Sequence, residues 1–160
     1  MKLSTKGRYA VMAMVDLASF SSETGKPIAL SDIAARQAIS LSYLEQLLAK
    51  LRRNGLVKSI RGPGGGYLLS RSSEDIRISD IVKAADEHLS ATRCVSGSAE
   101  GCNADKSRCL THDLWDELTK QIIMYLSSVS LADVCEKRVL GTSSLQLERK
   151  LNDQTSVIRV

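Results

Sequence analysis

A leucine repeat within residues 42–54 predicts an amphipathic helix. Its leucines recur at positions i, i+3, i+4 and i+7, the spacing of one buried helical face; they are Leu44, Leu47, Leu48 and Leu51. Gly55 follows at the position where helices commonly end in a left-handed residue. Residues 31–38 predict a shorter helix with Ser31 as its N-cap, and residues 38–40 form a tight turn between the two. The chain is therefore expected to contain a helix–turn–helix.

Two short β-type runs, residues 56–60 and 67–70, follow the leucine repeat directly. They flank the sequence RGPGGG at residues 61–66 and so predict a β-hairpin with a glycine-rich tip. A nucleotide-binding loop is a second interpretation of these glycines, but the chain lacks the GxxxxGK[ST] pattern of such loops. A helix–turn–helix followed by a hairpin is the order of a winged helix. The predicted fold class is therefore mainly α with a small β-hairpin wing.

Further helices are expected before and after this unit. Residues 5–20 are apolar nearly all round, which is typical of a buried helix, and residues 21–27 form a turn. Short helices are predicted over 79–86 and 131–137, and a long helix over 112–129. One apolar stripe runs along the long helix and consists of Leu114, Trp115, Leu118, Ile122, Tyr125, Leu126 and Val129. Little else in a chain of 160 residues can cover that stripe, so we expect a two-fold homodimer built on this dimerisation helix.

The composition divides the chain into four segments. We expect residues 1–89 to form a winged-helix domain of the DNA-binding type and residues 90–111 to form a loop that is small, polar and rich in cysteine. Residues 112–138 hold the dimerisation helix and the short helix after it. Residues 139–160 lack a regular apolar pattern and are expected to be a disordered tail.

Basic residues concentrate in the first half of the chain. The first 71 residues carry eleven Lys and Arg against four Asp and Glu, whereas the remainder carries eleven against fourteen. A basic half of this kind indicates a polyanionic partner. The chain has neither an apolar run of about 18 residues nor a clean signal-peptide cleavage site. We therefore predict a cytoplasmic protein with no membrane partner.

A winged helix places the N-terminal residues of its second helix in the major groove of duplex DNA. Glutamine pairs with adenine there, serine with several bases, and glutamate with the cytosine amino group. The candidates for base contacts are Ser40, Ser42, Tyr43, Glu45 and Gln46. The candidates for phosphate or minor-groove contacts are Arg52, Arg53, Arg61, Gly62, Lys2, Lys6, Arg8 and Lys58. Glu45 has an alternative interpretation, because Ser42 and Glu45 have the spacing of a capping box.

Three cysteines and a histidine form a candidate metal centre: Cys94, Cys102, Cys109 and His112. Thiolate and imidazole ligands suit an iron–sulfur cluster, zinc or copper. Their spacing lacks the short CxxC knuckles of most zinc sites, so an iron–sulfur centre, structural zinc and a thiol redox switch all remain open. Cys135 lies on an apolar stretch and is interpreted as a buried small hydrophobe. His88 has no motif partner and is interpreted as structural.

Two other classes of function compete with that of a DNA-binding regulator. Cys109 with His112 nearby is compatible with nucleophilic thiol catalysis, but no oxyanion motif or acidic partner appears at an informative spacing. A winged-helix protein–protein adaptor with structural zinc is the second alternative. We predict that the protein is not an enzyme and has no small-molecule substrate.

Three stretches resemble the family of iron–sulfur cluster regulators, winged-helix transcription factors with a three-cysteine cluster loop. They are LSTKGRYAVMAM at residues 3–14, the helix and wing at 40–69, and the cysteine loop at 92–115, in the same order. The resemblance implies a homodimeric transcription factor with a 2Fe–2S cluster, and zinc remains the alternative that the ligand chemistry leaves open. It also implies that Cys94, Cys102, Cys109 and His112 are the ligands. The implied function is that of a repressor of iron–sulfur assembly and iron homeostasis genes, acting on operator sites in double-stranded DNA.

Overall fold

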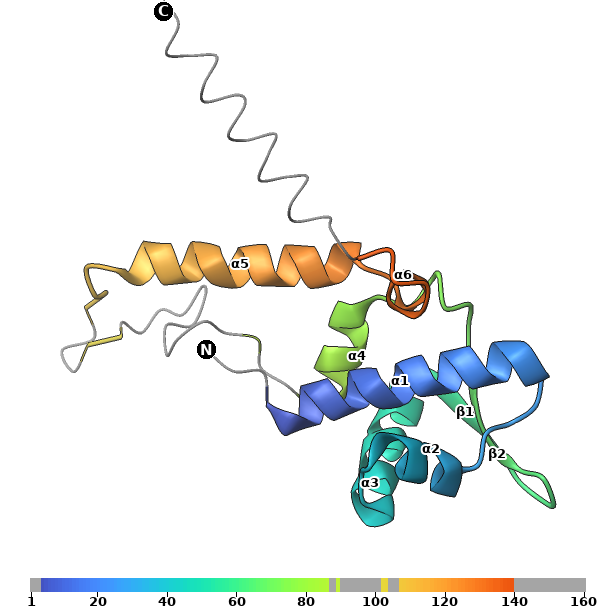
Figure 1. Cartoon of the computed structure of the whole chain (residues 1–160). Coiled ribbons are helices and arrows are strands. Elements are labelled where there is room, and N and C mark those ends of the chain that lie inside the picture. The colour runs from blue at the N-terminus through green and yellow to red at the C-terminus, as the bar shows by residue number, and fades with distance from the viewer. Residues whose placement is uncertain (1–3, 87–88, 90–101, 104–106, 140–160) are drawn as a thin grey trace, which may run out of the picture.

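The computed structural model describes residues 4–86, 89, 102–103 and 107–139 (Figure 1). Six helices and one two-stranded sheet follow in the predicted order within this part of the chain. No helix among the described residues is long and apolar enough to cross a membrane. The predictions for Lys2, His88, Cys94, most of the loop at 90–111 and all but the first residue of the tail at 139–160 concern residues outside those described.

The first helix, α1 (Thr5–Thr24), runs through the centre of the fold. Its buried aliphatic residues are Ala10, Ala13, Met14, Leu17 and Ala18, and Asp16 is buried with them. The side chain of Ser4 caps the helix by accepting a hydrogen bond from the backbone N–H of Lys6 at 3.2 Å. The helix continues four residues beyond the predicted end, until Gly25 stops it in a left-handed conformation with φ of 63°.

The helix–turn–helix consists of α2 (Leu30–Gln37) and α3 (Leu41–Arg53). The turn begins with Ala38 in a left-handed conformation, φ 51°. All four leucines of the repeat in α3 are buried, as predicted. The prediction of Ser31 as an N-cap is wrong: the N-cap of α2 is Ala29, which has no side chain to accept a hydrogen bond, and Ser31 is inside the helix.

The wing is an antiparallel hairpin of β1 (Val57–Ile60) and β2 (Gly66–Leu69). Its tip extends away from the helices (Figure 1). The base of the hairpin is attached to the segment before α2, because Ile28 and Tyr67 exchange backbone hydrogen bonds at 3.0 and 2.8 Å. A side chain at Gly66 would collide with the Ile28 carbonyl, so the glycine permits this close approach.

The remaining helices are α4 (Ile78–Ala84), α5 (His112–Ser128) and α6 (Leu131–Cys135). The C-terminal end of α5 is attached to the DNA-binding head by backbone bonds on both sides of Ser130. The amide of Ile78 donates to Val129 O at 3.0 Å, and the amide of Leu131 donates to Ile76 O at 2.8 Å. Leu131 is fully buried in the same core as α1 and α3. From this attachment α5 extends beyond the rest of the described fold (Figure 1).

Candidate nucleic-acid interface and cysteine centre

The exposed face of α3, which we term the recognition helix, is polar. Ser42, Glu45, Gln46 and Arg52 are exposed along it, opposite the buried leucines. Ser40 is also exposed and precedes the helix as its N-cap, in extended conformation with φ −62° and ψ 139°. Ser42 is therefore the second residue of the helix, and the capping-box interpretation of Ser42 with Glu45 is wrong. Glu45 is left as an exposed acid beside Gln46 on the surface predicted to meet DNA bases.

Tyr43 differs from the other candidates because it is half-buried. Its ring packs edge-on against Tyr9 of α1, with centroids 6.0 Å apart and an interplanar angle of 82°. The guanidinium of Arg8 lies 5.8 Å from the Tyr9 ring centroid. Tyr43 thus joins the start of the recognition helix to α1, and Arg8, a predicted phosphate contact, belongs to the same group of side chains.

A buried acid fixes α2 against α1, and sequence reasoning missed it. Asp16 accepts from Arg36 Nε at 3.0 Å and Arg36 Nη2 at 2.6 Å, and from Gln37 Nε2 at 2.7 Å. The Arg36 guanidinium also lies 4.0 Å from the centroid of the Phe20 ring. The hydrogen bond from Arg36 to the Asp16 carboxylate raises the pKa of that guanidinium. The only signal in the sequence is that Asp16 is the single acid within the mainly apolar stretch at residues 9–20.

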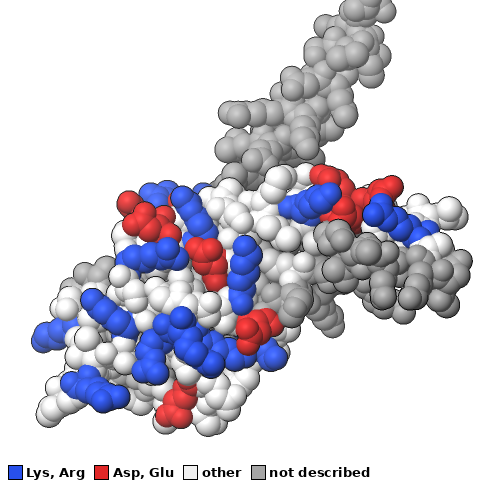
Figure 2. Space-filling view, turned by 180° about the vertical axis from the view of Figure 1, so that it is seen from behind, with Lys and Arg blue, Asp and Glu red and all other residues white. Residues whose placement is uncertain are grey.

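Basic side chains gather where the recognition helix ends. Figure 2 shows a cluster of Lys and Arg on one face of the protein, with few acids among them. Lys50, Arg52 and Arg53 occupy the last turn of α3, where cations interact favourably with the helix dipole. Arg52 Nη1 donates to Ser59 Oγ of β1 at 3.3 Å, which orients it beside the wing. The other predicted phosphate contacts among the described residues are exposed and comprise Lys6, Arg8, Lys58, Arg61 and Gly62.

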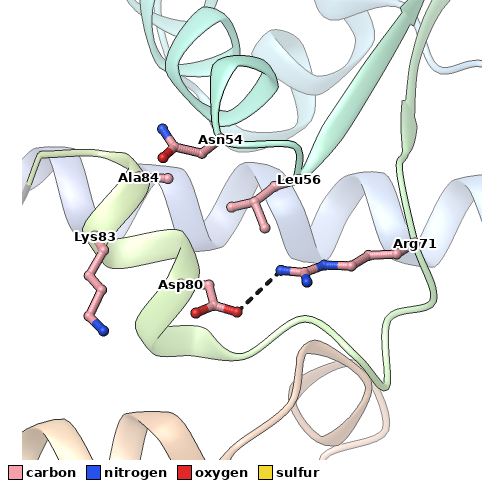
Figure 3. A pocket seen from close by; sticks show the side chains of 6 residues that line it. All are labelled: Asn54, Leu56, Arg71, Asp80, Lys83 and Ala84. Carbon is pink, nitrogen blue, oxygen red and sulfur yellow. Dashed lines mark hydrogen bonds and ion pairs between the residues drawn. The ribbon is translucent and has the colours of Figure 1, made fainter.

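A cavity of about 330 Å³ lies beside the end of the recognition helix (Figure 3). Arg71, which follows the wing, reaches across it toward Asp80 of α4, with Nη2 and Oδ2 3.3 Å apart. Asp80 also accepts from the backbone amide of Arg77 at 3.4 Å. Lys83 points away from this pair. The Arg71–Asp80 pair thus braces α4 against the segment that follows the wing.

Two predicted ligands meet at the head of α5. Cys102 Sγ lies 3.3 Å from Nδ1 of His112. The backbone amide of Cys109 donates to the same sulfur at 3.2 Å. His112 is the first residue of α5 and is 6 % exposed, so the helix holds its ring in place. The structure therefore brings the side chains of Cys102 and His112 together, with the backbone amide of Cys109 beside them.

The side chain of Cys109 is directed differently from that of Cys102. Its sulfur lies 3.8 Å from Thr111 Oγ1, which also accepts from Trp115 Nε1 at 3.1 Å. Among the described residues no three candidate ligands converge, and Cys94 lies outside them. Cys135 is half-buried on α6 and packs against the core, with its thiol 3.9 Å from Val15 O. Burial raises the pKa of that thiol, in agreement with its interpretation as a small hydrophobe.

The arrangement of a helix–turn–helix, a wing and a long helix after them recurs in known proteins. A family model for Rrf2, described as an iron-dependent transcriptional regulator, matches residues 3–137. The chain belongs to the Rrf2 family. Relatives named HTH-type transcriptional regulator IscR include that of Photorhabdus laumondii, 52% identical over 91% of this chain and 87% of its own. A regulator from Azotobacter vinelandii, ORF2, is 54% identical over 84% of this chain and 79% of its own.

Solved structures of Rrf2-type regulators confirm the fold class. IscR of T. potens matches with a TM-score of 0.68 and 38% identity, covering 86% of this chain and 88% of its own. CymR of B. subtilis, described as a global cysteine regulator, matches with a TM-score of 0.69 and 34% identity. The match covers 86% of this chain and 98% of the CymR chain. The protein is thus a winged-helix, DNA-binding transcriptional regulator of the Rrf2 family. This membership rules out the alternative of a thiol enzyme.

Proposed function

We propose that the protein is a homodimeric repressor that binds operator DNA through α3 and the wing and holds a 2Fe–2S cluster at the head of α5. The observation that carries the proposal is the contact between Cys102 Sγ and His112 Nδ1. It brings a thiol against an imidazole at the start of α5, the helix whose other end is hydrogen-bonded to the DNA-binding head. One element thereby spans the proposed sensing centre and the proposed DNA-binding surface.

The donor set fits an iron–sulfur cluster. Thiolates and an imidazole are iron–sulfur ligands, and the proposed ligands are Cys94, Cys102, Cys109 and His112. The Cys109 amide donates to Cys102 Sγ, and hydrogen bonds to sulfur tune the potential of such centres. A bound cluster would supply sensitivity to iron supply and oxidants. Relatives named IscR and the iron-dependent family favour a 2Fe–2S cluster over structural zinc.

Purification under anaerobic conditions tests this centre. The parent protein is expected to be coloured and to contain about equal amounts of iron and acid-labile sulfide, as a 2Fe–2S cluster requires. Cys102→Ala is expected to lose the visible absorption because the cluster loses a ligand. Cys135→Ala provides a matched control, because Cys135 belongs to α6, packs against the core and is not one of the proposed ligands. A colourless parent carrying stoichiometric zinc would replace the cluster with a structural metal.

The proposed DNA interface combines base-contacting and phosphate-contacting residues. Ser40, Ser42, Glu45 and Gln46 are exposed on or next to the first turns of α3, where a winged helix meets base edges. Arg52 and Arg61 flank them from the end of α3 and the tip of the wing. Lys6, Arg8 and Gly62 complete the proposed contacts, and Tyr43 is proposed to act through its packing on Tyr9.

Gln46→Ala and Arg52→Ala are expected to affect DNA binding in different ways, the first through sequence discrimination and the second through overall affinity. Loss of Gln46 should remove about 1–3 kcal/mol of discrimination between an operator and a scrambled duplex. Loss of Arg52 should weaken binding to both duplexes alike and reduce the salt slope by about 1. Fluorescence anisotropy on an operator fragment selected from genomic DNA, at several salt concentrations, measures both. Equal effects of Gln46→Ala on the two duplexes would remove this residue from base recognition.

A further inference from the structure

One acid lies among the cations at the end of the recognition helix. Asp86 Oδ2 is 2.7 Å from Lys50 Nζ. Lys50 belongs to the last turn of α3, whereas Asp86 comes just after α4. The two side chains therefore join the DNA-binding helix to the segment that leads toward the cysteines.

The surroundings of Asp86 are basic on several sides. The hydrogen bond and charge of Lys50 hold the pKa of this carboxyl below its usual range, and the charges of Lys6 and Arg53 lower it further. These two cations are themselves predicted to bind phosphates. An exposed carboxylate is thus located where the basic residues of the interface jointly attract a negative charge, as they would attract a phosphate oxygen.

The backbone holds the carboxylate in this place. Asp86 adopts a left-handed conformation with φ of 56°, which aspartate tolerates better than most residues. Its amide donates to Lys83 O at 3.0 Å, and the amide of Ala85 donates to Ile81 O at 3.1 Å. Since the main chain is fixed by the end of α4, little further ordering is needed for the carboxylate to reach Lys50.

We propose that Asp86 competes with DNA for Lys50 and so lowers the affinity of the protein for any duplex. The inference rests on the proposed DNA interface. The side chain of Asp86 is 67 % exposed and that of Lys50 28 %, so an arriving phosphate can displace the carboxylate. Phosphate contacts carry no sequence information. Asp86 therefore limits binding to operators and to other DNA to the same extent and leaves sequence preference unchanged.

Asp86→Asn tests the competition, with Glu136→Gln as the matched control. Glu136, which follows α6, forms a similar exposed ion pair, with Oε2 2.8 Å from Arg138 Nη1, and its substitution changes the net charge equally. Asp86→Asn is expected to bind a scrambled duplex about two- to five-fold more tightly at low salt, the size of an exposed ion-pair effect. Its salt slope should steepen by about 0.9 for each additional phosphate that the protein neutralises. Glu136→Gln should leave the slope unchanged.

A second background shows whether Asp86 acts through Lys50. In the Lys50→Gln background, adding Asp86→Asn is expected to change DNA affinity much less than it does in the parent. The reason is that the cation for which the carboxylate competes is absent. An undiminished effect in that background, or identical behaviour of Asp86→Asn and Glu136→Gln, would overturn the inference. A parent protein that binds no duplex at any salt concentration would instead overturn the proposed DNA interface. Thermal unfolding of each variant verifies that the fold is retained.

Discussion

Asp16→Ala is expected to lower the free energy of unfolding by about 2–3 kcal/mol. The carboxylate of Asp16 is fully buried and accepts three hydrogen bonds, two from Arg36 and one from Gln37. Its removal leaves those donors without their acceptor and opens a small space between α1 and α2. The Arg36 side chain is 32 % exposed, so water replaces part of the lost interaction and the effect stays below that of a fully buried pair. Urea denaturation followed by circular dichroism measures the change.

Asp32→Ala provides the matched control for Asp16. Asp32 is exposed in the first turn of α2, where an acid interacts with the helix dipole by about 0.3–1 kcal/mol. Asp32→Ala should therefore lower the free energy of unfolding much less than Asp16→Ala does. DNA affinity should also fall more in Asp16→Ala than in Asp32→Ala, because the position of α2 sets the angle at which the recognition helix meets DNA. Equal destabilisation by the two variants would show that the buried network contributes nothing beyond an ordinary surface acid.

The helix–turn–helix and wing could be predicted because their signals are local. The leucines of α3 recur within two turns, and Gly55 and the RGPGGG segment mark chain reversals through their own backbone preferences. The Asp16 network could not be predicted in the same way, since its partners lie about twenty residues further along the chain. The predicted N-cap of α2 and the alternative capping box in α3 are wrong for a related reason. Several adjacent residues have suitable side chains, and tertiary packing decides where a short helix begins.

The cysteine centre was predictable in composition but not in geometry. Three cysteines and a histidine indicate ligand chemistry through residue type alone. Their spacing does not say which of them meet, because the path of a long polar loop is not set by local preference. The structure supplies the contact of Cys102 with His112 and the amide bond to the sulfur. The hydrogen bond from Trp115 to Thr111 is likewise invisible in the sequence.

The apolar stripe of the long helix was predicted as one surface, and the structure separates it into two. Leu126 and Val129 pack against the core of the DNA-binding head. Leu114 and Tyr125, eleven residues apart and hence on one side of the helix, are 61 % and 49 % exposed. Of all residues in α5, only His112 and Thr119 are buried within the single chain. The outward part of the stripe is therefore the surface that we propose a second copy covers.

Tyr125→Glu is expected to raise the dimer dissociation constant by at least about 100-fold. A two-fold interface contains the changed residue twice, and burying each carboxylate among apolar side chains costs several kcal/mol. The monomer presents a single recognition helix, so operator affinity should fall by about 100-fold or more through loss of bivalent binding. Analytical ultracentrifugation and anisotropy on an operator fragment measure the two effects.

Ser127→Glu introduces the same charge two residues away, on a different side of α5. Ser127 is exposed, and successive helix residues point about 100° apart, so its side chain faces away from the Leu114–Tyr125 side. This variant should remain dimeric and bind the operator as the parent does. If both variants dissociate, negative charge added anywhere on α5 is sufficient to separate the two copies, and the apolar stripe has no specific role in the dimer. If Tyr125→Glu remains a dimer, the two copies associate through another surface, and the link from the cysteine centre to paired DNA binding must run through that surface instead.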